Sequence, residues 1–123
     1  MNLRLQALQA DDRPKFPVAI PEWGFSAFVQ TLTAADYDDY EAWAFKKDDG
    51  ANYRAKLVCR ALVDEQGQRV FTDEDATAVG HKSAYVVGRL FDLVALHNRT
   101  SVADLEELRK NSKAGPSAGS PSD

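Results

Sequence analysis

The stretch from Ala61 to Val94, ALVDEQGQRVFTDEDATAVGHKSAYVVGRLFDLV, decides the fold class of this chain. It begins at the apolar end of one helix, passes through a polar turn at Asp64–Gly67 and continues as a short strand-like piece, Arg69–Phe71. Thr72 and the three acidic residues after it have the pattern of a helix start. A long apolar helix closes the stretch. No part of it is typical of catalysis, and its layout favours a docking or scaffold module.

Side-chain caps set the boundaries of the predicted helices. N-cap residues stabilise a helix by about 1 kcal/mol each, because their oxygens accept from otherwise unpaired backbone amides. The sequence offers such residues at Thr33, Asn52, Thr72, Ser83 and Ser101. An aspartate three residues further on completes a capping-box-like pattern at Thr33–Asp36, Thr72–Asp75 and Ser101–Asp104.

Apolar residues recur at helical spacing behind these caps, which predicts amphipathic helices. The helix expected over Tyr53–Val63 presents Leu57, Val58, Ala61 and Leu62. The helix after Ser83 presents Val86, Val87, Leu90, Phe91, Val94 and Ala95. A short helix after Ser101 carries Leu105 and Leu108.

The first third of the chain has a different pattern. Asn2–Ala10 predicts a short, weak helix. Lys15–Ile20 and Phe25–Leu32 alternate apolar and other residues around a turn at Pro21–Gly24, which predicts a β-hairpin. Pro17 lacks a backbone donor, so we expect the first strand to lie at a sheet edge.

These elements predict an α+β fold that is mostly helical, with an N-terminal β-hairpin followed by about four helices. The chain of 123 residues fits one small domain. We expect that domain to span residues 1–111. Residues 112–123 are rich in Ser, Gly and Pro and lack any large apolar residue, so we expect a disordered tail.

Composition and charge exclude several classes of protein. The net charge is −4, and the chain has no basic stripe of the kind that binds nucleic acid. No apolar run approaches the roughly 20 residues of a membrane span. The single cysteine, Cys59, forbids an internal disulfide and fits a reducing compartment. Met1–Ala10 lacks the apolar core of a signal peptide, so we expect a cytoplasmic protein.

Three side chains could in principle act as catalytic bases or nucleophiles. His81 is expected near a helix start, and His97 in the last turn of a helix, where a cation suits the helix dipole. Both are better explained by structural roles than as general bases. Cys59 lies among apolar residues of a predicted helix, which favours a buried, inert thiol.

Acidic residues gather at Asp36–Glu41, at Asp48–Asp49 and at Asp73–Asp75. Carboxylates could hold a divalent metal, but the spacing matches no EF-hand loop, and the chain lacks a His or Cys cluster for zinc. Acids near helix starts are favoured by the helix dipole alone. We therefore predict no cofactor, no metal and no catalytic residue.

Aromatic residues are concentrated in the first half of the chain. Tyr37, Tyr40 and Trp43 recur at steps of three residues, and Trp23 stands in the predicted hairpin turn. Core packing is the simpler explanation for them. Because Trp and Tyr dominate binding hot spots, these four residues are also the best candidates for a partner-binding patch.

The order of these segments resembles the tail assembly chaperones of lambda-like long-tailed bacteriophages and prophages. The resemblance covers about residues 2–112. It rests on VAIPEWG (18–24), TLT (31–33), NYRAKLV (52–58), LVDEQG (62–67), VFTDED (70–75) and LEELRKNS (105–112).

The resemblance implies a non-enzymatic chaperone that binds the tape measure protein, keeps it soluble and helps to recruit tail tube subunits. It also implies self-association, and a contact with the tail tube protein through a longer, frameshift-extended form. Such a protein works in the host bacterial cytoplasm and leaves before the virion matures. The resemblance transfers no catalytic or metal residue.

Three other functions compete with this one. A structural minor tail component or small adaptor module would remain in the mature particle. A metal-dependent hydrolase is a weaker alternative, because it requires the acids of Asp36–Glu41 and Asp73–Asp75 to converge in one pocket. A DNA-binding regulator is disfavoured by the charge.

Overall fold

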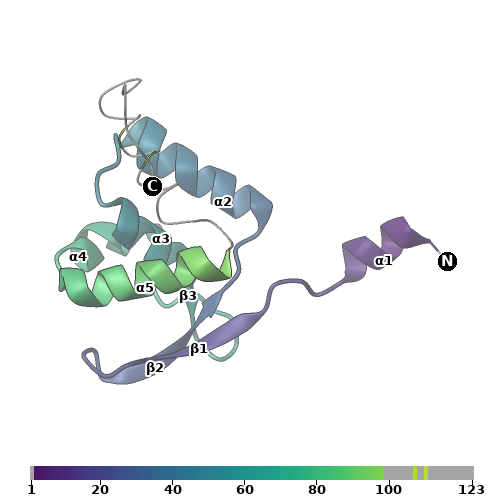
Figure 1. Ribbon diagram of the computed structural model, residues 1–123, viewed down its shortest axis with the longest axis horizontal. Helices are drawn as coiled ribbons and strands as arrows, with labels where there is room; N and C mark the ends of the chain where they lie inside the picture. The colour runs from purple at the N-terminus through teal and green to yellow at the C-terminus, as the bar shows by residue number, and fades with distance from the viewer. Residues whose placement is uncertain (1, 99–106, 108–109, 111–123) are drawn as a thin grey trace.

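The computed structural model describes residues 2–98, together with Glu107 and Lys110 (Figure 1). The fold is α+β and mostly helical, as predicted. In chain order its elements are α1 (Leu3–Gln9), β1 (Lys15–Ile20), β2 (Phe25–Gln30), α2 (Ala34–Glu41), a π-helical segment (Ala42–Lys47), α3 (Tyr53–Ala61), β3 (Leu62–Val63), a 3₁₀ turn (Asp73–Asp75), α4 (Ala76–Gly80) and α5 (Ala84–His97).

The predicted hairpin is present and belongs to a three-stranded antiparallel sheet of order β1–β2–β3. β1 pairs with β2 from Lys15 opposite Gln30 to Ile20 opposite Phe25. The turn closes at Gly24, whose φ of 83° suits a residue without a side chain. Pro17 lies on the edge strand, where its missing donor is tolerated.

The third strand was not predicted, because the sequence pattern continues the preceding helix to Val63. The helix ends instead at Ala61, and Leu62 is extended, with φ of −83° and ψ of 121°. Leu62 and Val63 are buried and pair with Val29 and Phe28 of β2. The strand-like piece predicted at Arg69–Phe71 contributes a single bridge, between Arg69 and Val63.

Most predicted caps are confirmed. The side chains of Thr33 and Ser83 accept from backbone amides of α2 and α5, and the amide of Thr72 donates to the Asp75 carboxylate at 2.8 Å. The predicted cap at Asn52 is wrong. This residue has a left-handed φ of 54°, and its side chain makes no cap bond to α3. The predicted cap at Ser101, its helix and the tail at 112–123 lie outside the described residues.

The core lies between the sheet and the helices. α5 packs against α3 and against β2, and every residue of its predicted apolar face is buried: Val86, Val87, Leu90, Phe91, Val94 and Ala95. Edge-to-face and tilted ring contacts run through Tyr40, Phe45, Tyr53 and Phe91 with centroids 5.5–6.0 Å apart. α1 projects away from this core (Figure 1). In the described part of the chain, no helix is long and apolar enough to cross a membrane.

Two leucines of α5 provide a matched test of this packing. Leu90 is fully buried, whereas Leu96 is 67% exposed. We expect Leu90→Ala to lower the free energy of unfolding by about 2–5 kcal/mol, because it leaves a cavity in the core. Leu96→Ala should change it by less than about 0.5 kcal/mol. Urea unfolding followed by circular dichroism measures both, and equal losses would contradict the described packing.

Candidate partner-binding surface

The structure separates the aromatic stripe that the sequence predicted. Tyr40 is fully buried, and its hydroxyl donates to the carbonyl of Tyr53 at 2.9 Å. Burial raises the pKa of Tyr40 above its ordinary value. Tyr40 is therefore a core residue in this conformation and offers no surface to a partner. Tyr37 and Trp43 are half-buried against the core, so part of each ring is accessible.

Trp43 lies at a hollow of the surface that is lined mostly by charged residues. The Nζ of Lys56 lies 5.2 Å from its ring centre, and the guanidinium carbon of Arg60 lies 5.0 Å from it, both within range of cation–π attraction. The hollow is lined by Asp39, Ala42, Trp43, Lys47, Arg60, Asp73 and Glu74. A partly exposed indole with charged neighbours is typical of a protein-binding patch.

Arg60 brings two of the acidic clusters together. Its Nε and Nη2 donate to the Asp73 carboxylate at 2.8 and 2.9 Å, and Nη2 also lies 2.9 Å from Asp39. Arg69 adds a bond of 2.8 Å to Asp73. Asp48, from the third cluster, accepts from Lys56 at 2.6 Å. The clusters thus converge, as the hydrolase alternative requires, but they converge on cations of this chain.

The same bonds set the charge state of Asp73. Burial alone would raise the pKa of this carboxyl, but the hydrogen bonds from Arg60 and Arg69 outweigh that effect and lower the pKa below its ordinary value. Among the described residues, no group of three His, Cys, Asp or Glu side chains is placed to hold a metal ion.

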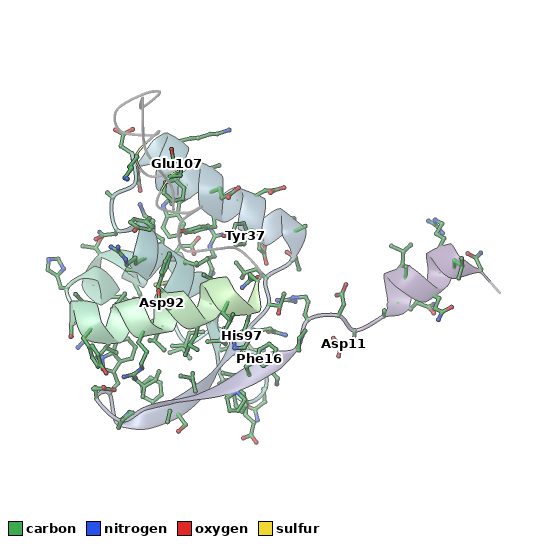
Figure 2. All side chains as sticks on the ribbon, viewed as in Figure 1. Asp11, Phe16, Tyr37, Asp92, His97 and Glu107 are labelled. Atoms are coloured by element: carbon green, nitrogen blue, oxygen red, sulfur yellow. The ribbon has the colours of Figure 1, made fainter. Side chains whose placement is uncertain are left out.

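The three residues considered for catalysis have other environments. The ring of His97 stacks on Phe16 with centroids 3.7 Å apart (Figure 2). Nδ1 of His81 lies 2.8 Å from the carbonyl of Thr77, one helical turn earlier. Cys59 is fully buried, and burial raises its pKa to about 12. At neutral pH its thiol stays protonated and is a poor nucleophile.

Trp23 belongs to a second aromatic hollow, which the sequence did not predict. Its ring lies 6.2 Å from that of Phe25 and 6.0 Å from that of Phe71. The hollow has a volume of about 590 Å³ and is lined by Glu22, Trp23, Phe25, Phe71, Asp75, Ala78, Val79 and Lys82; we call it the Trp23 groove. It joins the hairpin turn to the loop before α4, so no local sequence pattern could reveal it.

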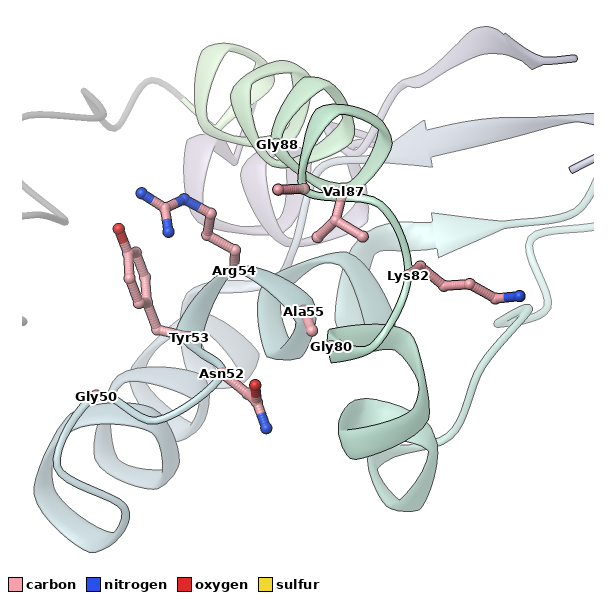
Figure 3. A pocket seen from close by; sticks show the side chains of 10 residues that line it. Gly50, Asn52, Tyr53, Arg54, Ala55, Gly80, Lys82, Val87 and Gly88 are labelled. Atoms are coloured by element: carbon pink, nitrogen blue, oxygen red, sulfur yellow. The ribbon is translucent and has the colours of Figure 1, made fainter. Parts of the chain in front are cut away.

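A third hollow, of about 620 Å³, lies between the start of α3 and the start of α5 (Figure 3). Gly50, Gly80 and Gly88 line it. A side chain at Gly80 would come within 2.7 Å of the Asn52 amide oxygen, so this glycine permits a close approach. Arg54 covers the faces of Tyr53 and Phe91, at 4.7 and 5.8 Å.

These features define a protein-contact module: a small α+β body whose ionic groups bind one another and whose aromatic residues reach the surface in hollows. The chain belongs to the phage tail assembly chaperone family, because the profile of that family matches residues 3–110. The family is non-enzymatic. No curated protein matches the sequence significantly.

The fold agrees with this assignment. The solved structure of the bacteriophage HK97 tail assembly chaperone is similar to this chain, with a TM-score of 0.56. The two share 19% sequence identity, and the match covers 76% of this chain and 92% of the HK97 chain. At this identity the similarity concerns the fold.

The Arg60 cluster generates a prediction about pH. Because the folded-state pKa of Asp73 is lowered, its contribution to stability is present above its unfolded pKa, about 3.9, and is lost as the pH falls through the folded pKa. Arg60→Met should lower the free energy of unfolding at pH 7 by about 1–3 kcal/mol. The difference in free energy of unfolding between Arg60→Met and the wild type should become smaller below about pH 4.

Urea midpoints measured between pH 7 and pH 3 check this. Lys46→Met is the matched control, because Lys46 is exposed in the π-helical segment and carries the same charge. It should follow the wild type at every pH. A gap for Arg60→Met that stays constant down to pH 3 would show that the cluster does not depend on ionised Asp73.

Proposed function

We propose that this protein binds the tape measure protein of its phage or prophage, keeps it soluble and helps to recruit tail tube subunits. The observation that supports this most strongly is the family match across residues 3–110. The proposal continues with the tail tube protein as a second partner, reached through a frameshift-extended form. It places the protein in the host bacterial cytoplasm and outside the mature virion.

The surface chemistry suits such a client. An amphipathic helix binds by laying its apolar side chains into a hydrophobic groove. Tyr37 and Trp43 supply partly exposed aromatic surface for the client, and Trp23 supplies such surface for a second protein contact. Charged side chains line the hollow at Trp43 and would fix the register of a bound helix.

Avidity explains how modest patches could hold a long client. The surface that one hollow offers is small compared with the area buried in a stable protein–protein interface. A single copy would therefore bind weakly. Many copies on one extended chain would convert weak contacts into durable coverage. Self-association of the chaperone is therefore part of the proposal, and the net charge of −4 would help to keep the assembly soluble.

Co-expression with the tape measure protein from the same genome tests the proposal. We expect the tape measure protein to move from the insoluble to the soluble fraction and to co-purify with the chaperone. Trp43→Ala should reduce the captured amount at least about fivefold, because truncation of an interface hot spot costs more than about 1 kcal/mol.

Tyr85→Ala is the matched control, because Tyr85 is an aromatic residue that is 73% exposed on α5 and lines none of the described hollows. It should capture as much tape measure protein as the wild type. A tape measure protein that stays insoluble, with no complex, would overturn the proposal. Recovery of the protein in purified virions would favour a structural tail component instead.

A further inference from the structure

α1 stands apart from the body of the protein. Of the α-helices in the described part of the chain, it alone has no buried residue. Leu3, Leu5 and Leu8 are 74, 45 and 69% exposed. An isolated helix shorter than roughly 12–15 residues is marginal in water. A helix of seven residues with exposed leucines therefore gains stability by docking on another surface.

The Trp23 groove is suited to receive such a helix. Five of its eight lining residues are apolar, and one of these, Phe25, is 41% exposed. Two of the three charged residues that line it, Glu22 and Asp75, are acidic. Glu22 is already paired with Arg89 of the same chain, so the match between the groove and α1 lies in their apolar side chains.

The groove of the same copy is out of reach of α1. The helix leaves the body at the start of β1, and the groove lies beside the hairpin turn at the other end of that strand, on the opposite side of the molecule (Figure 1). Arg13 and Pro14 are held at the start of β1 by hydrogen bonds with Gln30 and Thr31.

The length of the segment before β1, compared with the length of β1 itself, supports the same conclusion. Ala10–Asp12 connect α1 to Arg13 and Pro14 and span at most about 10 Å when fully extended. Half of α1 adds about 5 Å. β1 with its six residues is about 20 Å long, so the middle of α1 cannot reach its own groove.

We propose that α1 of one copy docks in the Trp23 groove of the next copy. We place the two surfaces in successive copies, so that copies add head to tail; a reciprocal exchange of arms, which would close at a dimer, is the competing arrangement. The inference names the contact behind the self-association in the proposed function, and so rests on that proposal. It also gives α1 a role as an arm that joins neighbours along a client.

Cysteine cross-linking tests the contact directly. In the full chain, Leu8→Cys combined with Phe25→Cys should give a ladder of covalent oligomers under mild oxidation. Cys59 does not contribute, because it is fully buried. Leu8→Cys combined with Leu96→Cys is the matched control, because Leu96 is exposed but lies outside the groove, and it should give no ladder. A ladder in the control, none in the test variant, or one that stops at two copies would overturn the proposal.

Sedimentation of purified protein without any tape measure protein gives an independent test. The average mass of the wild type should rise with concentration. Leu3→Ser with Leu8→Ser should stay monomeric, and so should Phe25→Ser. Mixing these two one-sided variants should give dimers only, because each retains one half of the contact. A mixture that stays monomeric would overturn the proposal.

Gln6→Ser with Gln9→Ser is the control on the same exposed helix and should associate like the wild type. The two proposals can fail separately. If the wild type forms chains but does not make the tape measure protein soluble, the client assignment fails and the arm contact stands. If the wild type makes its client soluble while Leu3→Ser with Leu8→Ser associates as the wild type does, the arm contact fails.

Discussion

The burial of α3 is the constraint on which the rest of the structure depends. Most of its residues are buried: Tyr53, Ala55, Lys56, Leu57, Val58, Cys59 and Ala61. A helix that is covered on nearly all sides needs neighbours on all sides. α5 packs on it, α2 and α4 flank it, and β3 continues directly from its last residue to pair with the hairpin. The elements of the body are therefore arranged around one helix.

This burial also explains the acidic residues. Lys56 is 4% exposed, and the Arg60 side chain is 9% exposed, so both cations need partners within the protein. Asp48 and the Ala51 carbonyl satisfy Lys56, while Asp39 and Asp73 satisfy Arg60. Carboxylates that resemble a metal site in the sequence are thus the counter-charges of a central helix. Their separation along the chain hides the cation that unites them.

Local patterns determined what the sequence could predict. The hairpin, the caps at Thr33 and Ser83 and the buried face of α5 follow from alternation, side-chain chemistry and helical period, and all are confirmed. β3 could not be predicted, because Leu62 and Val63 continue a helical pattern and become a strand only through pairing with β2. Tyr40 and Trp43 belong to one stripe, but tertiary packing buries the first and leaves the second partly exposed. The Trp23 groove also depends on tertiary packing.

These contacts give the interior and the surface of the protein different roles. The interior neutralises its own charges and satisfies the Tyr40 hydroxyl, so the body can keep one shape without a partner. The surfaces proposed for contact lie at its periphery, on the segment after α2, at the hairpin turn and on α1, each on a different part of the molecule. Occupying one of them leaves the others accessible. With the proposed contacts, one copy would bind a client and two neighbouring copies at once, which is the geometry that avidity along an extended chain requires.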